Sequence, residues 1–255
     1  NVYDIMLHFG TLVAVFIVYW KDIKQLIIEG IKMVGGWCTN IGRFASNKVS
    51  KDKDSKEYVS VINSPYRRFV MMIIISTIPT GILGLVLEKF VGGMAESLVL
   101  VGVCLLLTCV ILLICDEVKT GNKKEDTATY KDSIKIGIVQ GIATLPGVSR
   151  SGSTITACRL CGFSKEFAVK YSFIMSIPAI LGAVVLKLKD IIELGAGDVP
   201  YFNYAIGTIV AGVIGYLCIK AMLKIVTNDK FKYFAYYCGT IGIVAIIVSI
   251  VNVIR

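Results

Sequence analysis

Long apolar stretches separated by short charged segments dominate the sequence. Several of them approach or reach the roughly 20 residues that a helix needs to cross the hydrocarbon core of a bilayer. Backbone polar groups in lipid must be satisfied within the segment, so each stretch is predicted to be a helix rather than a strand. Six spans are expected, near residues 3–20, 69–87, 97–115, 166–186, 204–226 and 233–254. The pattern therefore predicts an all-α polytopic membrane protein.

Composition supports this fold class and excludes a soluble globule. Of the 255 residues, 55% are hydrophobic and only 18% are charged. The net charge of +9 is concentrated in loops and therefore does not indicate nucleic-acid binding. Residues 21–68 carry ten basic and five acidic residues, and residues 220–232 carry four lysines and one aspartate. Cytoplasmic loops of membrane proteins are enriched in Lys and Arg, so these segments are placed inside.

The remaining loops complete the predicted topology. The polar, lysine-rich segment 37–64 is expected to be a cytoplasmic loop. The polar segment 116–133 is expected to be a second one. The slightly acidic loops at 88–96 and 187–203 are placed outside. One crossing, by residues 166–186, then accounts for the change of side between the inside loop 116–133 and the outside loop 187–203.

Residues 134–165 match none of the spans. Ile134–Leu145 is apolar but too short to cross, Pro146 and Gly147 interrupt it, and Thr154–Cys161 forms a second short stretch. Irregular backbone at membrane depth is tolerated only inside protein or beside water. The segment is therefore predicted to be a re-entrant helical hairpin that enters and leaves on the cytoplasmic side.

The order of elements suggests inverted repeats within one integral membrane domain over residues 1–255. Three spans occupy residues 1–115, and the hairpin with three further spans occupies residues 134–254. An odd number of spans per unit inverts the next unit. The first unit has no hairpin, and the chain begins with Asn1 rather than Met. A second hairpin, entering from outside, is therefore expected before residue 1.

The most polar short sequence, TLPGVSRSGSTIT at residues 144–156, lies at the predicted tip of the hairpin. A guanidinium at membrane depth normally faces a cavity and holds an anion or an acid, and its planar fork matches phosphate oxygens. Hydroxyls, close backbone approach at glycines and a new helix N-terminus would add to an anion site. The candidate residues are Arg150, Ser149, Ser151, Ser153, Thr154, Gly147 and Gly152. The alternative is structural, with small residues packing helices and the arginine neutralising an acid.

Three further features are weaker candidates. His8, the single histidine, lies at the outer end of the first span and is either a proton-transfer group or a packing residue. Gln140, on the first arm of the hairpin, is a candidate for the binding site. Cys158 and Cys161 form a C-x-x-C, but without a second pair or a nearby histidine they are interpreted as packing residues.

With the segment QGIATLPGVSRSGSTIT, the chain resembles the bacterial undecaprenyl pyrophosphate phosphatase family of the bacitracin-resistance type. The pattern P-G-x-S-R-S-G-x-T is matched from Pro146 to Thr154, and YDIMLHFGTLVAVFIVYWK and FAVKYSFIMSIPAILGAVVL are also similar to family segments. The resemblance implies hydrolysis of a C55 polyprenyl diphosphate to the monophosphate carrier of cell-wall synthesis. It also implies a multi-pass protein of the bacterial plasma membrane whose site opens to the outer side.

The resemblance assigns diphosphate binding to Arg150, assisted by Ser149, Ser151 and Thr154, with His8 near the outer mouth of the site. The family's E-x-x-x-E-type acidic motif and its S-S-T-G-H stretch are not found in the chain. A divalent cation, Mg²⁺ or Ca²⁺, and the nucleophile are therefore expected to depend on residues before residue 1, with no metal ligand in this chain. The parent protein is expected to be an active hydrolase and this chain alone inactive. A homodimer is a further expectation.

A secondary transporter or flippase is the alternative from another functional class. Inverted repeats, broken helices and a charge at the membrane midplane also characterise secondary carriers. Arg150 would then bind an anionic, phosphate-bearing substrate that crosses the membrane intact. Hydrolysis of a polyprenyl diphosphate distinguishes the two functions.

Overall fold

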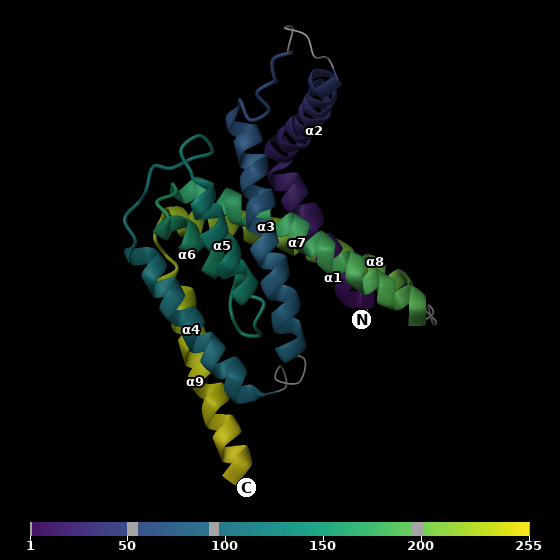
Figure 1. The fold of residues 1–255 in the computed structure, drawn as a ribbon. Helices are drawn as coiled ribbons and strands as arrows, with labels where there is room; N and C mark the ends of the chain where they lie inside the picture. Colours follow the sequence, from purple (N-terminus) through teal and green to yellow (C-terminus); the bar gives the residue numbers. More distant parts are fainter. Residues whose placement is uncertain (1, 50–55, 92–96, 195–200, 255) are drawn as a thin grey trace.

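The computed structural model describes residues 2–49, 56–91, 97–194 and 201–254, and Figure 1 shows their arrangement. Within these ranges the secondary structure is helical, apart from an isolated bridge between Lys123 and Phe163. The helices are α1 (Val2–Val18), α2 (Trp20–Val49), α3 (Pro65–Val91), α4 (Leu98–Glu117), α5 (Tyr130–Ile142), α6 (Arg150–Leu160), α7 (Lys165–Leu194), α8 (Tyr201–Thr227) and α9 (Lys232–Ile254). The predicted all-α class is confirmed.

Five of the described helices are long and apolar enough to cross a membrane. These candidate spans are Pro65–Leu87, Leu98–Glu117, Lys165–Val185, Tyr204–Thr227 and Lys232–Asn252. The apolar part of α1, Met6–Val18, is shorter because the helix breaks at Tyr19 and the chain continues into the polar α2. The molecule is thus a polytopic membrane protein with five candidate spans among the described residues. A sixth span in α1 remains a prediction.

Residues 37–64 are not a loop throughout, contrary to the sequence-based expectation. Helix α2 continues to Val49, and the chain then returns along it in residues 56–64. Asn40 stabilises this return because its side-chain amide donates to Val59 O at 2.9 Å and accepts from Val59 N at 2.8 Å. Asn47 likewise accepts from Lys56 N at 3.0 Å. Side-chain amides thus satisfy backbone groups of an extended segment that has no neighbouring strand.

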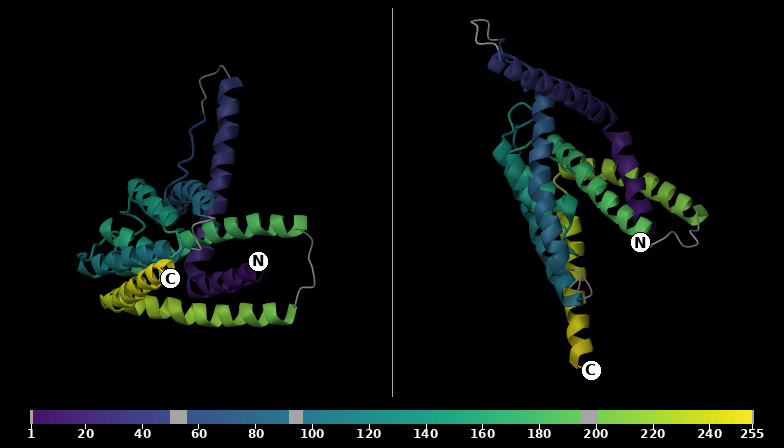
Figure 2. Two further views of the ribbon diagram at one scale, coloured as in Figure 1. Left: turned by 90° about the horizontal axis from the view of Figure 1, so that it is seen from below. Right: turned by 45° about the vertical axis from the view of Figure 1, so that its right-hand side comes forward.

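The long helices pack in pairs around the short α5–α6 hairpin (Figure 1). Helix α4 packs along α9, α3 along α5, and α1 along α8, with α1 lying between α7 and α8 in Figure 2. Small residues permit the closest of these contacts. A Cβ at Gly102 would lie 2.9 Å from Gly242 O of α9 and 2.6 Å from the Ile246 side chain. Such close backbone approach is typical of helix pairs in membranes.

Helix α6 lies at the centre of the molecule, where α4, α5 and α7 contact it. Every residue from Gly152 to Arg159 is buried. An aromatic cluster fixes the turn that follows, with Phe163 stacked on Phe167 at 4.9 Å between ring centroids. Tyr171 joins this cluster and donates a hydrogen bond to Met72 O of α3 at 3.1 Å. The hairpin's second arm is therefore held firmly from both ends.

Candidate active site

The hairpin turns at residues 143–149, between the end of α5 and the start of α6. Gly147 has φ +91, a left-handed conformation that glycine adopts without strain. Ser149 is the N-cap of α6, and its hydroxyl accepts a hydrogen bond from Gly152 N at 3.2 Å. The helix begins at Arg150, so the new helix N-terminus expected from the sequence lies within the motif.

Thr108, buried in the middle of α4, holds this turn in place. Its hydroxyl donates to Gly147 O at 3.0 Å and accepts from Ser149 N at 3.0 Å. One side chain thus satisfies two backbone groups that the irregular turn leaves without helical partners. These two hydrogen bonds fix the position of the hairpin tip along α4.

The tip faces a cavity of about 600 Å³ between α1, α7 and α8. Of the residues singled out in the sequence, five line it: His8, Gly147, Arg150, Ser151 and Thr154. They come from two segments more than 130 residues apart, since His8 lies near the start of α1. Apolar side chains including Val15, Ile180 and Ile219 complete the wall. A cavity with one charged end and apolar walls suits an amphiphilic ligand.

Arg150 is the cation of this cavity. Its side chain is exposed, and among the described residues its guanidinium has no hydrogen-bond or ion-pair partner. A guanidinium presents five N–H donors in a planar fork. The alternative of a structural arginine that neutralises an acid is therefore not supported by the contacts of Arg150.

Hydroxyl groups surround the arginine, and several were not identified from the sequence. Thr11 of α1 and Ser172 and Ser176 of α7 line the cavity. Ser172 lies 2.5 Å from the Thr154 hydroxyl, which also donates to Arg150 O at 2.9 Å. The four-residue spacing of Ser172 and Ser176, which places both on one face of a helix, is the signal that could have revealed them.

Four predicted site residues lie outside the cavity wall. Ser149 acts as the helix cap described above, and Gly152 packs against α4, where a Cβ would lie 2.7 Å from Leu112. Ser153 and Gln140 are buried, and their side-chain polar atoms have no hydrogen-bond partner in the described structure. Their roles in substrate binding remain predictions.

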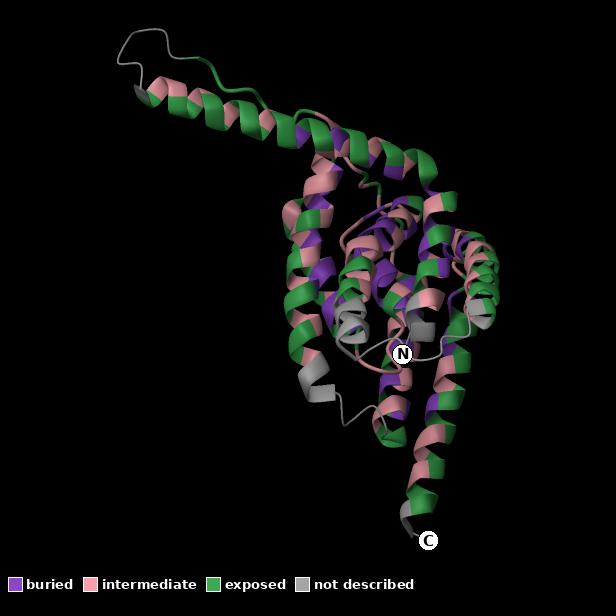
Figure 3. Cartoon of the chain, turned by 90° about the vertical axis from the view of Figure 1, so that its right-hand side faces the viewer, coloured by how far each residue is buried: buried purple, intermediate pink, exposed green. Residues whose placement is uncertain are grey.

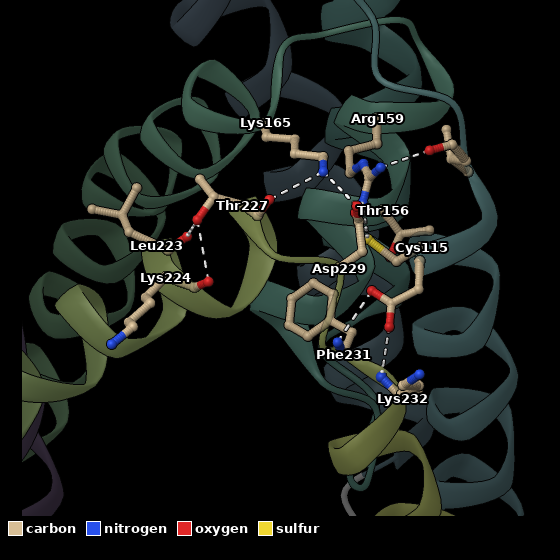
Figure 4. A network of polar contacts seen from close by, with 12 residues as sticks. Cys115, Thr156, Arg159, Lys165, Leu223, Lys224, Thr227, Asp229, Phe231 and Lys232 are labelled. Carbon is tan, nitrogen blue, oxygen red and sulfur yellow. Dashed lines mark hydrogen bonds and ion pairs between the residues drawn. The ribbon is translucent and has the colours of Figure 1, made fainter.

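A second arginine, Arg159, was not singled out from the sequence, and it lies at the other end of α6 (Figure 4). It is 2% exposed, and it donates to Asp229 Oδ1 at 2.9 Å and to Val118 O at 2.6 Å. Lys165 of α7 donates to the same carboxylate and to Thr227 O at 3.1 Å. Asp229, at φ 51, thereby joins the α8–α9 connection to α6 and α7, and Val118 joins the end of α4.

This network determines the ionisation of Asp229. Partial burial raises the pKa of the carboxyl, but the hydrogen bonds and positive charges of Lys165 and Arg159 outweigh it. The pKa of Asp229 therefore lies below its ordinary value of 3.8.

The described residues contain no group of three or more His, Cys, Asp or Glu side chains that could hold a metal ion. Cys158 and Cys161 are free thiols, the first fully buried in the core and the second half-buried. The cavity therefore offers an arginine and hydroxyls, which fit an anion, rather than ligands for a divalent cation.

Comparison with known proteins identifies the family of the chain. The family described as "Bacitracin resistance protein BacA" matches residues 1–244. The chain is 36% identical over 246 residues to the undecaprenyl-diphosphatase of Alkaliphilus metalliredigens, covering 96% of this chain and 83% of that protein. It is also 36% identical over 249 residues to the undecaprenyl-diphosphatase of Methanosphaera stadtmanae, covering 98% and 84% of the two chains. The chain belongs to the bacitracin resistance protein BacA family.

Proposed function

We propose that the protein is an undecaprenyl-diphosphatase, a hydrolase that converts a polyprenyl diphosphate to the monophosphate and phosphate. The observation that carries the proposal is the guanidinium of Arg150, which faces a partly apolar cavity without a protein partner. Several relatives that match nearly the whole chain carry this activity in their names. The same names favour hydrolysis over the transporter alternative.

In this proposal Arg150 binds and orients the diphosphate. Its fork donates to phosphoryl oxygens and stabilises the charge that develops on them in the transition state. Ser151 contributes a hydroxyl beside it. The Thr154 hydroxyl positions the arginine by donating to Arg150 O, and Ser149 fixes the start of α6. His8, from α1, lines the same cavity and is the candidate for proton transfer. The prenyl chain would follow the apolar wall.

The membrane placement of the hairpin is part of the same proposal. Helices α5 and α6 have 13 and 11 residues, or about 20 Å and about 16 Å at 1.5 Å per residue. Both are shorter than the hydrocarbon core, which is about 30 Å thick. The hairpin would enter from the end where α2 and the basic loops lie, and its tip would face the opposite side (Figure 1). The site then opens to the outer side of the cell membrane, with α1 as a sixth span and the two groups of spans as inverted repeats.

The divalent cation implied by the family resemblance and the expected homodimer remain predictions. Because the described residues of this chain do not form a metal site, we derive no step through the cation. The steps assigned here use the side chains of the cavity alone.

The proposal is tested by phosphate release from undecaprenyl diphosphate, using the full-length gene product in detergent. For Arg150→Ala we expect kcat to fall by about 10²- to 10³-fold, the usual cost of losing one donor to a developing oxyanion. Arg150→Lys keeps the charge but not the fork, so its activity should lie between the two. The apparent melting temperature of Arg150→Ala should equal that of the wild type, because the guanidinium has no protein partner to lose.

Two results would contradict the proposal. Folded wild-type protein that releases no phosphate would favour the transporter instead. Full activity in Arg150→Ala would exclude the arginine from the phosphatase site.

A further inference from the structure

Helix α2 is the most amphipathic of the described helices, and it crosses the end of the bundle instead of running along it (Figure 3). One side of α2 carries large apolar residues that are exposed, with exposed fractions from 41% to 68%. These residues form what we call the apolar side of α2: Ile27, Ile31, Val34, Trp37, Ile41 and Phe44. Their spacing of three or four positions places them on one face of the helix.

Contacts on another side of α2 fix its position beside the first turn of α3. Glu29 accepts a hydrogen bond from Arg67 Nε at 2.7 Å, and Asp22 accepts from the Tyr66 hydroxyl at 3.0 Å. Val61 packs against Gly36, where a Cβ would lie 3.3 Å from it. Tyr66 and Arg67 belong to the first turn of α3, whose candidate span begins at Pro65. Helix α2 therefore lies at the end of a membrane span.

The charges of α2 add a second, independent observation. The helix contains five basic and two acidic residues. Both acids are already paired, Asp22 with Lys170 at 3.0 Å and Glu29 with Arg67. Lys21, Lys24 and Lys48 are exposed. The side of the molecule that carries α2 thus presents uncompensated positive charge beside an exposed apolar surface.

We propose that α2 is an interfacial helix whose apolar side inserts into the headgroup region of the leaflet at the basic end, where its lysines bind anionic phospholipid. Helices with a charged face and an apolar face that carries Trp and Phe bind membrane surfaces in this manner. An anionic membrane surface attracts the Lys and Arg side chains that lie close to it. A protein partner would explain the exposed apolar side. It would not explain why this side lies beside the end of the α3 span and next to an excess of lysine.

The sequence offers an internal probe, because its two tryptophans, Trp20 and Trp37, both lie on α2. In Trp20→Phe, with any tryptophan outside residues 1–255 also replaced by Phe, fluorescence reports on Trp37 alone. The full-length variant is reconstituted into vesicles of phosphatidylcholine and phosphatidylglycerol with either brominated or ordinary acyl chains. We expect brominated chains to quench Trp37 and aqueous iodide to quench it far less than in the protein unfolded in denaturant.

Three further variants refine this test in the Trp20→Phe background. Ile41→Asp places a charge on the apolar side and should abolish quenching by brominated lipid, whereas Thr39→Asp, on an exposed position outside it, should not. In vesicles of phosphatidylcholine alone the quenching should weaken. Replacement of Lys21, Lys24 and Lys48 by Gln should remove the difference between the two lipid compositions.

The proposal is overturned if Trp37 is quenched by iodide and not by brominated lipid. It is also overturned if Trp37 is protected from iodide at high protein content but becomes accessible when the protein is diluted into excess lipid. That result would show that a second copy of the chain covers the apolar side. Neither outcome depends on phosphatase activity, so this proposal and the proposed function fail separately.

Discussion

Two arginines at opposite ends of one short helix have contrasting environments. Arg159 is almost completely buried and is matched by Asp229 and the Val118 carbonyl. Arg150 is exposed to the cavity and has no partner among the described residues. A buried guanidinium without a counter-charge is costly, so the pairing of Arg159 stabilises the fold. Arg150 is instead left with its donors available to a ligand anion.

At the scale of single residues, we predict that the Thr108 hydroxyl controls activity without touching substrate. Thr108→Val conserves volume but leaves Gly147 O and Ser149 N without their partner, at a cost of about 1–3 kcal/mol for each buried group left unsatisfied. A displaced tip would misplace Arg150, and we expect kcat to fall by about tenfold or more. Phosphate release measures the effect. Thr108→Ser keeps the hydroxyl and is the control; equal loss in both variants would show that the hydrogen bonds are irrelevant.

At the scale of elements, the short hairpin depends on one backbone conformation at its tip. We predict that Gly147→Ala reduces both activity and the apparent melting temperature. The new Cβ would lie 2.8 Å from Val101 O and 3.0 Å from the Cys104 Cβ, at a residue with φ +91. A non-glycine residue in such a conformation costs about 1–3 kcal/mol before the overlap is counted.

Gly81→Ala is the matched control for this variant, because a Cβ at Gly81 meets no atom within 4 Å. It introduces the same methyl group into the spanning helix α3. Comparable losses in the two variants would refute the specific role of the tip. A loss confined to Gly147→Ala would assign the effect to the turn.

Elements were predictable from the sequence where one local pattern dominates. Apolar length located the five candidate spans within a few residues of their observed bounds, because a membrane helix satisfies its own backbone. Pro146 and Gly147 marked the hairpin turn for the same local reason. Helix α2 was not predicted, and its second half, residues 37–49, was assigned to a polar loop. The returning segment that supports it is joined by contacts up to 19 positions apart.

The candidate site was likewise predictable only where its residues form a local sequence pattern. The motif around Arg150 was visible because its polar residues stand between apolar stretches. Ser172, Ser176 and Thr11 resemble ordinary helix-packing residues until the fold brings them to the cavity. Arg159 could not be assigned at all, since Asp229 lies 70 positions away and the pair exists only in the tertiary structure.

At the scale of the whole molecule, the Asp229 network connects four separate parts of the fold. Its members come from the end of α4, the end of α6, the start of α7 and the α8–α9 connection (Figure 4). The hairpin's second arm is thereby tied to helices on both sides of the molecule. Loss of the carboxylate should therefore affect global stability rather than the chemistry at Arg150.

We predict that Asp229→Asn lowers the stability of the protein at neutral pH. Arg159 would lose its charged partner, and because the Asp229 side chain is 41% exposed we expect about 1–3 kcal/mol, less than for a fully buried pair. Arg159 would still donate to Val118 O. The apparent melting temperature of the two proteins in detergent measures the difference.

The advantage of the wild type over Asp229→Asn should depend on pH in a defined direction. The pKa of Asp229 is lowered in the folded protein, so its contribution to stability is fully present above the ordinary carboxyl value of 3.8 and is lost as the pH falls through the lower folded value. Other carboxylates titrate in the same range, Asp132 among them, but they are common to both proteins and cancel in the comparison. The melting temperatures should therefore be separated at neutral pH and converge in acid below pH 3.8. A separation that persists unchanged into acid would mean that the neutral carboxyl serves as well as the carboxylate, and that charge pairing does not hold the four segments together.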